Sequence, residues 1–196
     1  ADLKNMKFRV GGVAGVILTR LGVVPQQIAA GDIYPSLEKG TIDAAEWVGP
    51  YDDEKLGFVK VAKYYYTPGW WEPNSQNSMF VNLKAWEALP KEYQAAFTAA
   101  CGESNAVSMA KYDHLNPTAL KSLISKGAQL RRFPDAVLDA CYNAAQDQYA
   151  EWSEKHPEFK VMYDSYNKYL KSQVDWFQVV EGTHDNYMTR KLKGRT

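Results

Sequence analysis

Hydrophobic and polar positions follow two different patterns along the chain, and the pattern changes near residue 83. Before that point, short segments with a few apolar residues, such as "KFRV" and "DAAEWV", alternate with segments such as "VAGVILTRLG", whose apolar residues recur every three or four positions. Short segments of this kind are typical of strands, and the wider spacing is typical of helices. Strand–helix–strand units in this order predict an α/β fold with a mainly parallel sheet and helices on its faces.

Turn residues set the expected bounds of several elements. The segment "GDIYPSLEKG" is predicted to be a helix with Asp32 as its N-cap, Pro35 in its first turn and Gly40 as its C-cap. "VVPQQI", "KYYYTPGW" and "NSMFVN" are predicted to be extended, and "YDDEKLGFVKVA" to be helical. Residues 1–82 are therefore predicted to form an α/β lobe with cleft and hinge strands.

From Leu83 onward the helical spacing dominates. Residues 83–134 are predicted to be helical, punctuated by Pro90 and Pro117, with one short strand at "AQLRRF"; residues 135–196 are predicted to form long helices, broken near Pro157. The last of these helices carries one apolar stripe, made of Phe159, Tyr163, Tyr166, Leu170, Val174 and Phe177. The stripe is interpreted either as packing on its own chain or as a contact with a second protomer.

The composition and the absence of familiar motifs narrow the classes of function. The 196 residues carry 23 basic and 23 acidic side chains, so an electrostatic nucleic-acid binder is not expected. No apolar run in the sequence approaches a membrane span, and no Gly-x-Ser-x-Gly, His-Glu-x-x-His or phosphate-loop signature occurs. Cys101 and Cys141 have no Cys/His metal-ligand spacing, and the sequence leaves their pairing open.

Polar and aromatic residues stand at the ends of the predicted strands, where ligands of open α/β sheets collect. They are Arg9, Glu46, Trp47, Trp70, Trp71, Glu72 and Asn82. An arginine offers a planar fork that grips a carboxylate, and two nearby glutamates would repel that carboxylate unless a cation lay between them. The pattern favours an organic acid bound together with a metal ion. The alternative is an internal Arg9–Glu46 ion pair with no ligand.

The segments "GDIYPSLEKGTIDAAEWVGPYDDEKLGF" and "PGWWE" resemble the solute-binding proteins of TRAP (tripartite ATP-independent periplasmic) transporters. Within that family the chain is most similar to the 2-oxoacid-binding branch, and the resemblance covers essentially the whole chain. It implies a periplasmic-binding-protein-like (class II) two-lobed fold, of which this chain is the C-terminal portion, with a long C-terminal helix. A complete member also has preceding chain that supplies most of the first lobe and a further metal-binding glutamine, so we expect a fragment or a processed piece.

The resemblance also implies roles for individual residues. Arg9 is expected to pair with the ligand carboxylate, with Trp47, Trp70, Trp71 and Asn82 also in the ligand site. Glu46, the main-chain carbonyl of Trp47, and Glu72 are expected to hold a sodium ion, with calcium as the alternative.

The family's function is transport without covalent chemistry. The implied ligand is a small 2-oxoacid such as pyruvate, captured in the periplasm and delivered to the TRAP membrane permease subunits. Members of the 2-oxoacid branch form homodimers by exchanging the C-terminal helix, so a homodimer is expected here as well. The alternative function is an α/β enzyme acting on a small carboxylate, with Glu46 or Glu72 as general base.

Overall fold

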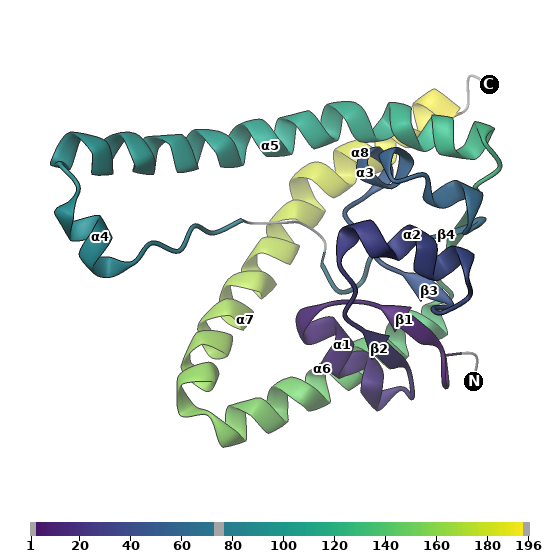
Figure 1. Cartoon of the computed structure of the whole chain (residues 1–196), viewed down its shortest axis with the longest axis horizontal. Coiled ribbons are helices and arrows are strands. Elements are labelled where there is room, and N and C mark those ends of the chain that lie inside the picture. The colour runs from purple at the N-terminus through teal and green to yellow at the C-terminus, as the bar shows by residue number, and fades with distance from the viewer. Residues whose placement is uncertain (1–2, 73–76, 194–196) are drawn as a thin grey trace. The chain divides into compact units, whose positions relative to one another are not determined.

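A computed structural model describes residues 3–72 and 77–193, which form two compact units, 1–144 and 145–196. Figure 1 shows the chain from its purple N-terminus to its yellow C-terminus. The three-part division made from the sequence stays a prediction.

The first unit contains a small parallel sheet at its N-terminal end. Strand β1 (Lys7–Arg9) lies in the middle, with β2 (Val24–Gln26) on one side and β3 (Ala44–Ala45) on the other. Helix α1 (Gly12–Arg20) connects β1 to β2, and α2 (Ala30–Glu38) connects β2 to β3 (Figure 1). The predicted strand–helix–strand units with parallel pairing are confirmed.

A compact apolar core supports this sheet. Phe8 and Val10 from β1 and its end pack with Leu18, Val23 and Cys141, all of them buried. The indoles of Trp70 and Trp71 pack against the same cluster. Burial of such side chains supplies most of the stability of a small lobe. Because the two tryptophans pack on this core, the core also holds the loop that carries them.

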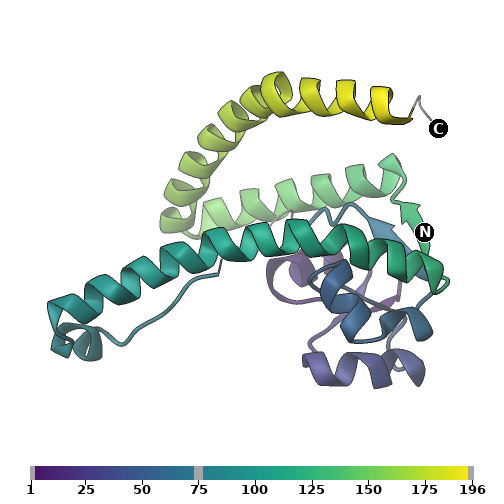
Figure 2. The same cartoon turned by 90° about the horizontal axis from the view of Figure 1, so that it is seen from above.

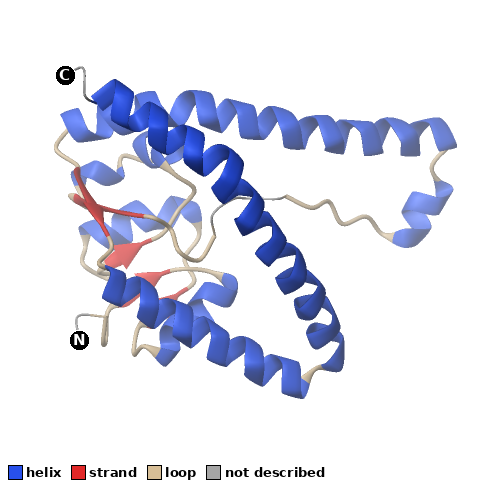
Figure 3. Ribbon diagram, turned by 180° about the vertical axis from the view of Figure 1, so that it is seen from behind, coloured by secondary structure: helices blue, strands red, loops and turns tan. Residues whose placement is uncertain are grey.

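A second, separate sheet has two strands. Strand β4 (Tyr64–Thr67) pairs in parallel with β5 (Gln129–Arg132), which is drawn apart from the first sheet in Figure 3. Helix α3 (Pro50–Lys55) and a 3₁₀ turn (Phe58–Lys60) lie between β3 and β4 along the chain. The parallel pairing was predicted, whereas the division into two sheets was not.

Helix α2 corrects three details of the prediction. Pro35 lies in the interior of the helix and not in its first turn, and the C-cap is Lys39 and not Gly40. The N-cap is Ala29, without a side-chain cap, and Asp32 lies inside the first turn. The prediction of Asp32 as N-cap is therefore wrong, although a carboxylate in the first turn still interacts favourably with the helix dipole. Gly40 follows the helix with φ of 68°, the left-handed conformation that favours glycine after a helix end.

Two further helices extend from this region. After α4 (Leu83–Ala88), α5 (Lys91–Ser125) runs for 35 residues without a break at Pro117. Because Pro117 has no amide hydrogen, the carbonyl of Asp113 has no helical hydrogen-bond partner. Asp113 is an exposed residue. Figure 2 shows α5 running from α4 to the part of the unit that contains α3. The only buried residues of α5 are Ala119 and Leu123, near the end that packs against α3.

The second unit is helical. It contains the last turns of α6 (Asp135–Lys155), then α7 (Pro157–Phe177), a π-helical turn (Gln178–Gly182) and α8 (Thr183–Lys193). The predicted break at Pro157 is confirmed. Phe159 and Tyr163 of α7 pack against Tyr149 and Trp152 of α6, with the Phe159 and Trp152 rings 5.5 Å apart. Among the described residues, no helix is both long and apolar enough to cross a membrane.

Candidate functional site

The carboxyl ends of β1 and β3 bring Arg9 and Glu46 together. Arg9 pairs in register with Ala45, and the amide of Glu46 donates to the carbonyl of Arg9 over 2.9 Å. The Nη1 atom of Arg9 donates to Oε1 of Glu46 over 2.6 Å and to the Glu46 carbonyl over 2.8 Å. The two side chains are only 15% and 16% exposed. The internal ion pair considered in the sequence analysis is therefore present.

This ion pair does not use the whole guanidinium group. The Nε atom donates to the carbonyl of Ile28 over 3.2 Å, and the group lies 4.9 Å from the ring centre of Trp47. Within the described parts of the chain, Nη2 of Arg9 makes no hydrogen bond, so it can donate to an added carboxylate. The other contacts fix the orientation of the fork in advance.

A hollow of about 410 Å³ opens beside Arg9. It lies at the carboxyl ends of β1 and β2 and is lined by Arg9, Val10, Gly11, Gln27, Ile28 and Ala29. Sequence reasoning missed Gln27 and the carbonyl of Ile28. The available signal was their position directly after β2, because parallel neighbours end at the same sheet edge.

Glu46 lies in an environment that disfavours its negative charge. Burial raises its pKa, and the negative charge of nearby Glu72 raises it further, while the positive charge of Arg9 and hydrogen bonds from Trp71 and Arg9 oppose the shift. The partly buried carboxylate of Glu46 and the exposed carboxylate of Glu72 repel each other, and a cation would relieve that repulsion. The donors are oxygens without thiolate or imidazole, which suits a hard cation such as sodium or calcium.

These two carboxylates do not amount to a complete metal site. Within residues 3–72 and 77–193, no group of three or more acidic, histidine or cysteine side chains is placed to hold a metal ion. A cation here therefore needs further oxygens, from main-chain carbonyls, from a bound acid or from another part of the protein.

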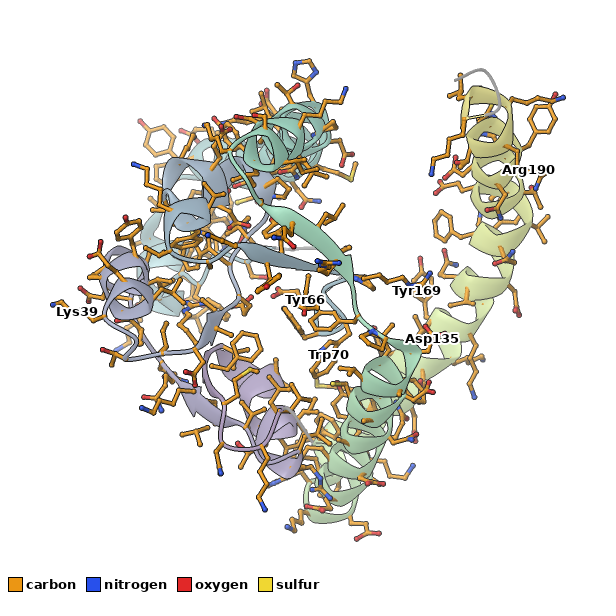
Figure 4. The ribbon with its side chains drawn as sticks, turned by 90° about the vertical axis from the view of Figure 1, so that its right-hand side faces the viewer. Lys39, Tyr66, Trp70, Asp135, Tyr169 and Arg190 are labelled. Atoms are coloured by element: carbon orange, nitrogen blue, oxygen red, sulfur yellow. The ribbon has the colours of Figure 1, made fainter. Side chains whose placement is uncertain are left out.

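Trp70 and Trp71 follow β4 and are held by aromatic contacts. The Trp71 ring centre lies 5.4 Å from that of Trp70 and 6.1 Å from that of Phe8, both edge to face. Figure 4 labels Trp70 beside Tyr66, whose ring stacks on Phe133 with centres 4.9 Å apart. These contacts position the segment that ends at Glu72.

Asn82 lies in a different place from the other predicted site residues. Its side chain accepts a hydrogen bond from the amide of Ala85 over 3.2 Å and caps α4. Residues 77–82 are not a strand, contrary to the prediction, because they pair with no neighbouring strand in the described structure. Figures 1 and 2 both draw α4 at the far end of α5 from the first sheet. The role of Asn82 in ligand binding stays a prediction.

Asp53 is a further residue that sequence reasoning missed. It is 6% exposed, and its Oδ2 atom accepts a hydrogen bond from the Tyr65 hydroxyl over 2.5 Å. Its Oδ1 atom is buried without a hydrogen-bond partner in the described structure. Burial raises the pKa of Asp53 to about 6, against the opposing effect of the hydrogen bond from Tyr65.

The raised pKa of Asp53 predicts a pH-dependent stability. The folded protein keeps the Asp53 proton up to about pH 6, whereas an unfolded chain loses it near its ordinary pKa of 3.8. The contribution of Asp53 to stability is therefore complete below the lower value and is lost as the pH rises through 6, by about 3 kcal/mol in total.

Urea unfolding of the wild type and of Asp53→Asn at several pH values measures this contribution. The stability of the variant relative to the wild type should rise between about pH 4 and pH 7, because asparagine does not titrate. A stability difference that stays constant over this range would contradict the assignment.

Comparison with known proteins adds a family and several relatives. A family model, DctP, described as "Bacterial extracellular solute-binding protein, family 7", matches residues 1–155. Over 187 residues, 95% of this chain, the sequence is 42% identical to a monocarboxylate 2-oxoacid-binding periplasmic protein of Nostoc sp. (strain PCC 7120).

Two crystal structures are also similar. A TRAP transporter solute-binding protein from Bordetella bronchiseptica RB50, a mixed-occupancy dimer with copurified calcium and picolinate, matches 100% of this chain at 52% identity with a TM-score of 0.93. A TRAP periplasmic solute-binding protein from Pseudoalteromonas atlantica T6c, with bound sodium and pyruvate, matches 94% at 35% identity with a TM-score of 0.89. The chain spans only 51% of the Nostoc protein and 58% and 56% of the two crystallised chains.

Proposed function

Because this chain belongs to the DctP family of bacterial extracellular solute-binding proteins, we propose that it forms one wall of a receptor for a small 2-oxoacid. Since the chain spans about half the length of its relatives, the receptor is a longer protein that contains this chain. In it, Arg9 binds the acid's carboxylate, and the acid also contacts a cation.

The observation that carries the proposal is the arrangement around Arg9. One nitrogen of the guanidinium group holds Glu46, another holds the Ile28 carbonyl, and Nη2 remains for a ligand. The hollow beside it offers a half-buried place for a short acid, where an ionic hydrogen bond is stronger than in water. The indoles of Trp47, Trp70 and Trp71 provide apolar surface for the rest of the ligand.

A cation completes the proposed site. Glu46 and Glu72, together with the main-chain carbonyl of Trp47, are the oxygen donors that this chain would contribute. The mutual repulsion of the two glutamates and the raised pKa of Glu46 support this assignment. The cation would neutralise the glutamates and attract the ligand's oxygens. The relatives crystallised with sodium and with calcium support either ion.

Calorimetric titration of the complete protein with pyruvate tests this function. Binding should require sodium or calcium, and replacement of both by choline at constant ionic strength should weaken it at least tenfold, because coupling between two ligands is reciprocal. The pyruvate should be recovered unchanged. Equal affinity with and without both cations would remove the cation from the proposal, and absence of 2-oxoacid binding in every salt would remove the function.

The alternative interpretation as an enzyme, with Glu46 or Glu72 as general base, is wrong, because the family consists of transporter solute-binding proteins.

We further propose that the receptor works in the periplasm, as the names of the relatives state for those proteins, and delivers its ligand to TRAP permease subunits. We also propose that it is a homodimer held by the C-terminal helix.

A further inference from the structure

Helix α3 is bound at four consecutive residues. The amide of Tyr51 donates to Asn116, Asp52 accepts from Tyr112 over 2.7 Å, Asp53 accepts from Tyr65 over 2.5 Å, and Glu54 accepts from Lys126 over 2.6 Å and from Ser122. A helix of six residues has little stability of its own, so these bonds determine where it lies.

Three of the four residues face the same neighbour, and Asp53 does not. Tyr51, Asp52 and Glu54 bind residues of α5, and Glu54 also binds Lys126 directly after the end of that helix, whereas the partner of Asp53 is Tyr65 in β4. Asp53 is also the only one of the four that is buried. Burying a carboxylate with an unpaired oxygen costs free energy, so the presence of Asp53 at this buried position requires a physical explanation.

The bond between Asp53 and Tyr65 joins the two segments that carry the proposed cation donors. Asp53 follows Glu46 and Trp47 through the Gly49–Pro50 turn, and Tyr65 precedes Glu72 through the loop after β4. Burial and the Asp53 charge raise the pKa of the Tyr65 hydroxyl, so the hydroxyl stays protonated and remains a donor.

We propose that Asp53 and Tyr65 are positioning residues for the cation. Their hydrogen bond ties α3 to β4 and so holds Glu46 and Glu72 at a fixed separation against their mutual repulsion. A site held in its binding arrangement avoids the cost of ordering it when the ion arrives. This inference rests on the proposed function, because it assumes that the two glutamates bind a cation together with a 2-oxoacid.

The test is the sodium dependence of pyruvate affinity in the complete protein carrying Tyr65→Phe. Removal of the donor should lower the affinity about tenfold at limiting sodium, as expected for the loss of a hydrogen bond to a charged acceptor. Saturating sodium, with choline keeping the ionic strength constant, should restore most of the affinity. A defect in general packing would not respond to sodium in this way. Thermal unfolding confirms that the variant is folded.

Two further variants sharpen the comparison. Tyr112→Phe removes a tyrosine–aspartate hydrogen bond from the neighbouring residue of the same helix, but that bond leads to α5 and not to β4, so pyruvate affinity should stay within about twofold of the wild type. Asp53→Asn keeps an oxygen acceptor for Tyr65 and should stay within about threefold.

Several outcomes would overturn the inference. They are an unchanged affinity in Tyr65→Phe, an equal loss in Tyr112→Phe, a loss in Asp53→Asn as large as in Tyr65→Phe, or a loss that saturating sodium does not relieve. If the wild type itself binds no 2-oxoacid, the proposed function fails first, and that result is distinct from all of these.

Discussion

Replacing Arg9 by alanine should lower the affinity of the complete protein for pyruvate by on the order of a hundredfold or more. The variant loses the nitrogen atoms that would hold the ligand's carboxylate. It also leaves Glu46, which is 16% exposed, without its positive partner. An unpaired, partly buried carboxylate would repel the incoming acid, so both effects act in the same direction. Isothermal titration calorimetry with saturating sodium measures the change.

Two substitutions serve as comparisons for Arg9→Ala. Arg9→Lys keeps the charge but cannot contact the Ile28 carbonyl, Glu46 and a ligand at once, so its affinity should lie between those of Arg9→Ala and the wild type. Lys39, which is labelled in Figure 4, lies at the exposed end of α2. Lys39→Ala removes one positive charge there and should leave binding unchanged. A near-native affinity for Arg9→Ala would refute the assigned role and leave the Arg9–Glu46 pair as a structural ion pair.

The Arg9–Glu46 pair shows what the sequence predicts well. Each residue stands at the end of a predicted short strand, and parallel strands end at the same edge of a sheet, so the two side chains were expected to lie close together. The structure places Nη1 and Oε1 2.6 Å apart. Local patterns were sufficient here, because β1 and β3 belong to one compact strand–helix–strand arrangement.

The pairing of β4 shows where local patterns fail. Tyr64 pairs with Gln129, and the long helix α5 lies between them along the chain. A short strand contains no signal that identifies so distant a partner, so a single sheet was the simpler expectation. The same separation along the chain explains why the hydrogen-bond partners of Asp53 and Asp52 could not be predicted. The acidic run "YDDE" is typical of a solvated helix, and only the folded chain brings Tyr65 and Tyr112 to it.

The apolar stripe on α7 divides into two parts in the structure. Phe159 and Tyr163 pack against Tyr149 and Trp152 within the second unit, as the first interpretation of the stripe expected. The rest of the stripe is exposed: Tyr166 by 59%, Leu170 by 40%, Val174 by 59% and Phe177 by 44%. Burying the remaining exposed area of these four side chains is worth about 3 to 6 kcal/mol before ordering costs, so this part of α7 tends to find a second surface.

A second copy of the same chain is the partner we propose for these four residues. The Bordetella relative crystallised as a dimer, and this chain is 52% identical to it. The polar residues Lys160 and Asp164 of α7 form an ion pair with each other, with Nζ and Oδ2 2.5 Å apart, and so leave the apolar residues as the main source of association. Contacts between two identical helices would be reciprocal, as in other twofold-symmetric dimers.

The complete protein should therefore be a dimer at micromolar concentration, and a version ending at Glu158 should be a monomer. A gentler variant, Leu170→Glu with Val174→Glu, adds charge to the exposed part of the stripe and should also give a monomer, because two like charges would face the same charges of the partner. Lys171→Glu changes charge on the same helix outside the stripe and should remain dimeric. Light scattering coupled to size exclusion measures all four proteins. If the complete protein is a monomer, or if the double variant remains a dimer, the stripe is not the interface.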